Sequence, residues 1–227
     1  MKPKWIRYFI LFLPMFCFFS ASALADTNKK IVEDFSEYRS SQFPTWWKTW
    51  PFQRNDAKKV YRVMKEKENR FLRSEENESL SKQIYKGFDW QPLIYPYLNW
   101  KWRARVLPEG ANETKPETND SACAVYVAFG RTSKRSMKFT WSSTLPEGTI
   151  HVKEPGKTVF KILDGGAKHL NQWRGHSIHL KEIYKELFKS DMNQEPSGIA
   201  ILTDGNAVNK KAACDYDDFS ISKKPIY

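Results

Sequence analysis

Hydrophobic and polar residues alternate strictly over residues 97–106, which is the clearest structural signal in the chain. One side of this ladder is apolar and consists of Leu98, Trp100, Trp102 and Ala104. The other side is polar and consists of Tyr97, Asn99, Lys101, Arg103 and Arg105. Alternation over this length is typical of a strand with one buried face. Two tryptophans on that face require a deep core of the kind that two packed sheets provide.

Short runs of the same kind, separated by turns, continue along the chain. They predict further strands at residues 30–35, 59–65, 70–74, 81–85, 121–129, 137–142, 158–163, 197–203 and 212–222. One segment has helical spacing instead, with apolar residues at 180, 183, 184, 187 and 188. The pattern as a whole predicts a mainly β protein. We expect an antiparallel, jelly-roll-like β-sandwich with one short amphipathic helix near 180–189.

The first 25 residues have the features of a secretory signal peptide. Three basic residues precede an apolar run over residues 9–19, and Ala23-Leu24-Ala25 forms a small-residue cleavage site. We expect cleavage after Ala25, a periplasmic or secreted location and no stable membrane anchor; an uncleaved anchor is the competing interpretation. Residues 26–227 then suit a single β-sandwich domain.

The charge balance favours acidic partners. The formal net charge is +11, and removal of the three basic residues of the signal leaves +8. Such a surplus suits an anionic polysaccharide, lipopolysaccharide or a membrane surface. Alternatively, it only keeps the protein soluble. The export signal and the lack of any nucleic-acid-binding motif argue against a nucleic-acid partner.

Two cysteines remain in the exported chain, Cys123 and Cys214, both in predicted strands. Because export places them in an oxidising compartment, we predict a disulfide between them. The alternative is two small buried side chains on strands that are not neighbours.

The polar side of residues 97–106 is the first candidate site. Lys101, Arg103 and Arg105 lie side by side there, and like charges in a row repel one another unless anions separate them. They predict either a binding face for an acidic sugar or phosphate, or ion pairs with carboxylates of a neighbouring strand.

The tryptophans of an aromatic segment bracketed by prolines are the second candidate site. Sugar rings stack on exposed indoles, so Trp46, Trp47 and Trp50 predict a carbohydrate platform at an edge of the sandwich. Alternatively, these rings cap the core, because tryptophan is more often buried than exposed.

The carboxylates Asp34, Asp217 and Asp218 are the third candidate. If the first and last strands are neighbours, these side chains could hold a structural calcium ion. Asp204 and Asp215 extend the set, and a carboxyl pair for glycoside hydrolysis is the alternative use. His176 and His179 are a weak metal signal without the glutamate of a zinc-protease helix. We predict no catalytic residue and, calcium apart, no cofactor.

Several segments together resemble the DUF3047 family of exported bacterial proteins. They are residues 95–103, 119–129, 139–142, 201–204 and 216–219. The resemblance implies a jelly-roll-like sandwich similar to galactose-binding-like and carbohydrate-binding modules, and it implies no activity. The chain departs from the family pattern at residues 174–179 and in the turn at residues 203–207, which weakens any ligand role for that turn.

The sequence thus favours an exported, non-catalytic β-sandwich that binds a glycan or an anionic envelope polymer. One alternative is a polysaccharide hydrolase or lyase on the same scaffold. Another is a structural envelope protein that binds another protein at a sheet edge. We expect no enzymatic activity, although the residues alone do not exclude it.

Overall fold

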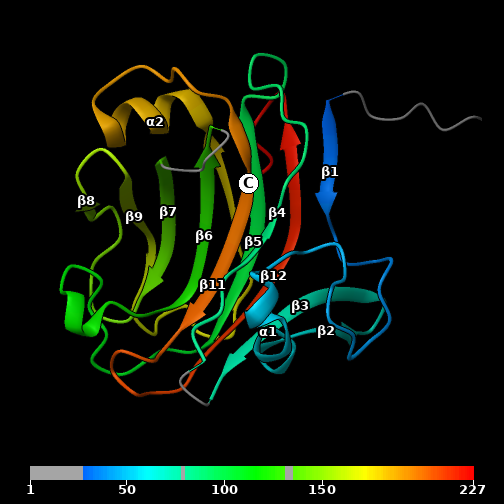
Figure 1. Ribbon diagram of the computed structural model, residues 1–227. Coiled ribbons are helices and arrows are strands. Elements are labelled where there is room, and N and C mark those ends of the chain that lie inside the picture. Colours follow the sequence, from blue (N-terminus) through cyan, green and yellow to red (C-terminus); the bar gives the residue numbers. More distant parts are fainter. Residues whose placement is uncertain (1–27, 78–79, 131–134) are drawn as a thin grey trace, which may run out of the picture.

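The computed structural model describes residues 28–77, 80–130 and 135–227, which form two six-stranded β-sheets packed face to face (Figure 1). Sheet A consists of β1 (Lys29–Glu33), β2 (Tyr61–Glu66), β3 (Asn69–Glu76), β5 (Tyr97–Val106), β10 (Arg174–His179) and β12 (Ala212–Ser222). Sheet B consists of β4 (Ile84–Lys86), β6 (Ser121–Phe129), β7 (Arg135–Ser142), β8 (Ile150–Glu154), β9 (Thr158–Gly165) and β11 (Pro196–Asp204).

The strand order places the long strand β12 at the centre of sheet A. The order is β10–β5–β12–β3–β2, and β1 pairs with β12 beyond the end of β3. Sheet B has the order β4–β11–β6–β7–β9–β8. All strand pairs are antiparallel except β7 with β9, which are parallel, so sheet B is mixed rather than purely antiparallel.

The interior is rich in large aromatic rings that meet across the two sheets. Trp100 of β5 lies 5.7 Å from Phe139 of β7, and Trp102 lies 6.4 Å from Trp141, measured between ring centroids. The inward side chains of β5 are fully buried, as the alternation predicts. These rings fill the space between the sheets, so the predicted mainly β sandwich is confirmed.

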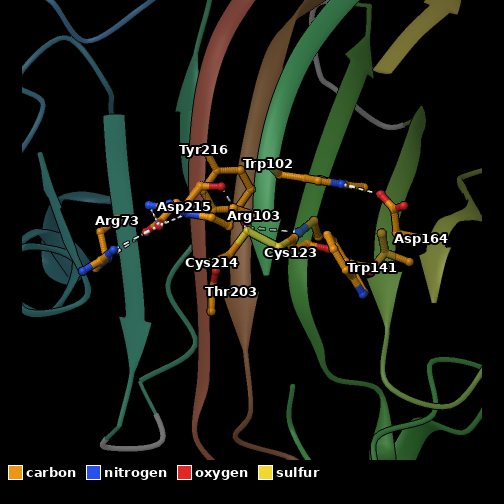
Figure 2. Close-up of a disulfide and its surroundings, with 12 residues drawn as sticks. Arg73, Trp102, Arg103, Cys123, Trp141, Asp164, Thr203, Cys214, Asp215 and Tyr216 are labelled. Atoms are coloured by element: carbon orange, nitrogen blue, oxygen red, sulfur yellow. Dashed lines mark hydrogen bonds and ion pairs between the residues drawn. A yellow bond between two sulfur atoms is a disulfide. The ribbon is translucent and has the colours of Figure 1, made fainter. Parts of the chain in front are cut away.

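A disulfide joins the two sheets at their centres. Figure 2 shows Cys214 of β12 bonded to Cys123 of β6, with Trp102 and Trp141 nearby. The two Cα atoms are 5.4 Å apart, within the range that a disulfide spans. The predicted pairing is confirmed, and it fits folding in an oxidising compartment outside the cytoplasm. The predicted signal peptide itself lies outside the described residues.

The amphipathic helix is also confirmed, as α2 (Leu180–Phe188), which lies across one end of sheet B (Figure 1). Its buried side packs on the sandwich, with the Tyr184 ring 4.9 Å from that of Phe129. The His179 side chain caps the helix by accepting a hydrogen bond from the Glu182 amide. In the described part of the chain, no helix is long and apolar enough to span a membrane.

Five short elements differ from the prediction: one helix, two 3-10 turns and two edge strands. Residues 54–60 form a second helix, α1 (Arg54–Val60), where a strand was expected from residue 59, because Ala57 and Val60 share one buried side at helical spacing. Short 3-10 turns precede it at Pro51–Gln53 and occur again at Pro116–Thr118. The edge strands β8 and β10 were not expected, because they are polar and their burial does not alternate clearly.

Candidate functional site

A groove of about 620 Å³ lies along the outer edge of sheet B, beside β4 and β11. It is lined by Trp46, Lys48, Trp50, Gln83, Tyr85, Lys86, Gly87, Ala128, Ser197, Gly198, Ile199 and Ala200. Two of its rings are largely in solvent, since Trp46 is 64% exposed and Trp50 is 62% exposed. Large aromatic side chains left open in one concavity are unusual on a soluble domain and are typical of a binding surface.

The aromatic segment divides its three tryptophans between the core and the groove. Trp47 is only 2% exposed, packs on Phe35 at 6.1 Å and donates a hydrogen bond from Nε1 to Glu33. Trp46 and Trp50 stay outside and line the groove. Trp47 therefore belongs to the core, as one of the two interpretations of this segment has it, whereas the other two rings lie at the surface.

Backbone pairing fixes the segment beside the sheet. Lys48 and Tyr85 form an antiparallel bridge in which each amide donates to the carbonyl of the other at 2.8 Å. The bridge extends sheet B by one residue beyond β4, so Lys48 continues the outer surface of the sheet. The flanking prolines, Pro44 and Pro51, prevent a longer ladder.

Small side chains line the groove together with the rings. They include Ala128 of β6 and Ala200 of β11, and Ala200 pairs with Tyr85 of β4. Gly198 is required here, because its φ is +147° and a Cβ atom would lie 2.4 Å from the Lys86 carbonyl oxygen. The glycine therefore permits the close approach of β4 to β11 beside the groove.

The buried carboxylate of Glu33 contacts side chains that line or support the groove. Glu33 Oε2 lies 2.8 Å from Lys86 Nζ and 3.2 Å from Trp47 Nε1. The same ammonium lies 5.4 Å from the centre of the Trp46 ring, within the range of a cation–π contact. Glu33 thus connects the core tryptophan to the groove and helps to fix the orientation of Trp46.

The basic row of β5 lies on the outer face of sheet A, and carboxylates of neighbouring strands accompany it. Arg103 forms an ion pair with Asp215 at 2.7 Å and with Glu66 at 3.1 Å. Lys101 forms an ion pair with Asp218 at 2.7 Å, and Arg105 is half-buried. Figure 2 shows Asp215 between Arg103 and Arg73. The hydrogen bond from Arg103 lowers the pKa of Glu66.

The three carboxylates considered for calcium have separate partners. Asp34 accepts hydrogen bonds from Ser36, Asp217 accepts one from Asn69 and Asp218 pairs with Lys101. Burial raises the pKa of Asp217 to about 7. Among the residues that the structure describes, no three His, Cys, Asp or Glu side chains are placed to hold a metal ion.

A buried polar cluster on the outer face of sheet B was not found from the sequence. It consists of Glu113, Asp120, Lys138 and Asp204, with Tyr126 beside it. Burial and, to a smaller extent, the nearby Asp120 carboxylate raise the pKa of Asp204 to about 6. Burial lowers the pKa of Lys138, which is only 4% exposed. Alternation along β7 places Lys138 on the outer side, but no sequence signal shows that the loop at residues 107–120 contributes buried groups there.

A second buried network joins β9 to the edge of sheet A. Asp164 accepts hydrogen bonds from Trp102 at 2.7 Å and from Arg174 at 2.9 Å, and its carboxylate lies 2.7 Å from His176 Nε2. Burial by itself would raise the pKa of Asp164, but these hydrogen bonds outweigh it and hold the pKa below its ordinary value. His176 therefore contacts a carboxylate, and His179 caps a helix.

Comparison with known proteins gives one family and several distant structures. The family model described as "Protein of unknown function (DUF3047)" matches residues 45–220. No curated protein matches the chain. A family 11 carbohydrate-binding module of a Clostridium thermocellum cellulosomal cellulase is similar with a TM-score of 0.42 and 8% identity, covering 86% of this chain and 94% of that one.

Two further solved structures are similar at the same level. A mutant of the carbohydrate-binding module CBM29-2 has a TM-score of 0.37 and 6% identity, covering 86% of this chain and 91% of that one. The xyloglucanase domain of NopAA from Sinorhizobium fredii has a TM-score of 0.39 and 9% identity, covering 68% and 83% of the two chains. Scores this low do not transfer a ligand or an activity.

Proposed function

The chain belongs to the DUF3047 family, and we propose that it is an exported, single-domain protein that binds a glycan in the groove at the edge of sheet B. The observation that carries this proposal is the pair of exposed indole rings, Trp46 and Trp50, which line one groove together with Tyr85. A sugar ring presents apolar C–H groups on its face and hydroxyls on its edge. It can therefore lie on an indole while its hydroxyls meet nearby polar groups.

The groove is better suited to this ligand than the basic row of β5. Arg103 and Lys101 already face carboxylates, so an incoming anion would have to displace Asp215, Glu66 or Asp218. The groove requires no such exchange, because its two exposed rings are open. Trp47 supports the site from the core but offers no open surface to a ligand.

The test is a binding screen of the purified protein against immobilised glycans and polysaccharides. We expect Trp46→Ala and Trp50→Ala each to weaken binding by about tenfold, which corresponds to about 1.4 kcal/mol. Phe52→Ala is the matched control, because Phe52 is 82% exposed in the same segment and does not line the groove. Equal loss in all three variants, or no glycan bound by the wild type, would contradict the proposal.

Polysaccharide cleavage is a second candidate, and the buried cluster is the observation that favours it. Glu113, Asp120 and Asp204 share one face with Lys138, and burial raises the pKa of both Asp204 and Glu113, a pattern frequent at catalytic sites. The cluster is largely buried, and Glu113 connects it to the surface by lining a pocket of about 300 Å³ together with His151 and Lys153. Release of reducing ends that disappears in Asp204→Asn would favour this function over binding alone.

A further inference from the structure

We propose that the groove takes an acidic glycan, whose anionic group pairs with Lys48 while its sugar rings lie on Trp46, Trp50 and Tyr85. This inference rests on the proposed function and specifies its ligand class. The shared chemistry is a carboxylate or sulfate ester on a polysaccharide chain.

The charge of the groove is the first observation. Among the described residues that line it, two are lysines and none is a carboxylate. Glu33 neutralises Lys86 from behind. Lys48 is exposed, and the structure records no ion pair for it within the described residues. The groove therefore carries one uncompensated positive charge beside its aromatic rings.

The placement of Lys48 is the second observation. Lys48 is bridged to Tyr85, Tyr85 pairs with Ala200, and all three line the groove. Directly paired residues share a face of a sheet, so these three side chains form one row across the strands. At about 4.8 Å per strand, the row is roughly 10 Å long. A linear chain lying across the strands would meet the ammonium of Lys48 at one end and the ring of Tyr85 beside it.

The contrast with the basic row of β5 is the third observation. Lys101 has a carboxylate at 2.7 Å and lies 5.3 Å from the ring centre of Tyr227, so its charge is compensated within the protein. Lys48 has the same charge, and no carboxylate of the described part of the chain forms an ion pair with it. A ligand anion at Lys48 would gain an ion pair without breaking one, which makes acidic glycans the complementary class.

The experiment compares polymers that differ only in charge. The probes are polygalacturonate with its methyl-esterified form, and dextran sulfate with dextran. Wild-type protein is expected to bind the acidic member of at least one pair more tightly than its neutral partner, and more weakly as salt increases. Binding to the first pair assigns a carboxylate, and binding to the second assigns a sulfate ester.

A charge-matched pair of variants then locates the contact. Lys48→Gln is expected to lose about fivefold in affinity for the acidic polymer and nothing for the neutral one. Lys58→Gln removes the same charge from the exposed surface of α1 and is expected to change neither. Circular dichroism and thermal unfolding of both variants establish that the fold is intact.

The outcomes separate this inference from the proposed function. Equal binding of acidic and neutral polymers, lost in Trp50→Ala but unchanged in Lys48→Gln, would overturn the acidic ligand and leave glycan binding in place. Equal losses in Lys48→Gln and Lys58→Gln would show attraction by the overall positive charge and would also overturn it. No binding of any probe would contradict both proposals.

Discussion

The outer face of sheet A and the groove at the edge of sheet B are built from the same residue types, yet only the groove leaves them open. On sheet A, Asp215 lies between Arg73 and Arg103, and the Trp173 ring lies 4.7 Å from the Arg103 guanidinium. In the groove, Trp46 and Trp50 face solvent and Lys48 has no recorded counter-ion in the described chain. A cation or aromatic ring therefore stabilises the fold when neighbouring side chains already contact it. It is available to a ligand when they do not.

Strand pairing explains this difference. The cations of β5 lie opposite the acidic stretch of β12: Arg103 lies opposite its ion-pair partner Asp215, and Lys101 lies opposite Asp217, next to its ion-pair partner Asp218. Within residues 28–77, 80–130 and 135–227, sheet B ends at β4 and the single Lys48 bridge, and no further strand there faces that edge with a carboxylate. The cations of a central strand therefore find counter-ions within the sheet. Lys48, at the edge of sheet B, is instead available to a ligand.

The largest expected effect comes from breaking the buried ion pairs of sheet A. Asp215→Ala leaves Arg73 and Arg103 close together without their shared carboxylate, which should lower the free energy of unfolding by about 3–5 kcal/mol. Chemical denaturation measures this change, and glycan affinity of the folded fraction should stay the same. A loss below about 1 kcal/mol would show that this face is not a stabilising element.

The next largest effect on stability is expected from removing the covalent link between the two sheets. The Cys123–Cys214 disulfide spans 91 residues of sequence, so its removal in the double alanine variant should cost about 4 kcal/mol in the chain-entropy model. Denaturation of the variant, compared with oxidised wild type, measures the cost, and reduced wild type is the control for the loss of the thiols themselves. A variant as stable as the oxidised protein would mean that aromatic packing alone holds the sheets together.

A pH-dependent effect should distinguish Asp217 on sheet A. Its pKa is raised to about 7 by burial, so the folded state binds a proton that the unfolded chain releases near pH 4. The contribution of Asp217 to stability is therefore greatest at low pH and declines as pH rises from about 4 to about 7. Relative to Asp217→Asn, wild type should lose on the order of 3 kcal/mol over this range.

Denaturation of both proteins at pH 4, 5.5, 7 and 8 measures this difference. Asp218→Asn is the control, because Asp218 is more exposed and pairs with Lys101. A constant difference between wild type and Asp217→Asn across the range would contradict the prediction.

The smallest effects on stability are expected for Lys101 and Lys48. These two variants test most directly whether sheet A or the groove binds the ligand. Lys101→Ala removes a partly exposed ion pair and should cost less than about 1 kcal/mol without changing glycan affinity. Lys48→Ala should leave stability unchanged within about 0.5 kcal/mol while weakening the binding of acidic glycans. The reverse result, with binding lost in Lys101→Ala, would move the ligand to sheet A.

Much of the fold could be predicted from local patterns. The alternation at residues 97–106 identified a strand and its buried side, and the spacing of Leu180, Ile183 and Leu187 identified the only predicted helix. The polar edge strands β8 and β10 were missed, because their backbone pairing stabilises them without an alternating apolar side. The parallel pairing of β7 with β9 was also missed. It depends on the path of the connection between the two strands, and the residue types of the strands do not indicate that path.

The candidate site was only partly predictable for the same reason. The proline-bracketed tryptophans drew attention to the segment, but the sequence did not show that Trp47 turns inward. It also gave no sign that Lys48 pairs with Tyr85, 37 positions away in the chain, or that Glu33 lies behind both Trp47 and Lys86.

Features that depend on neighbouring residues followed from the sequence alone: which strands have an apolar side, where α2 forms, and that the chain carries a surplus of positive charge. Which of these charges are compensated depends instead on the tertiary structure. Lys48 and Lys101 look alike in the sequence, but one lies at an edge and the other lies across from β12. Ion pairs act over a few ångströms, and those distances exist only once remote strands have come together.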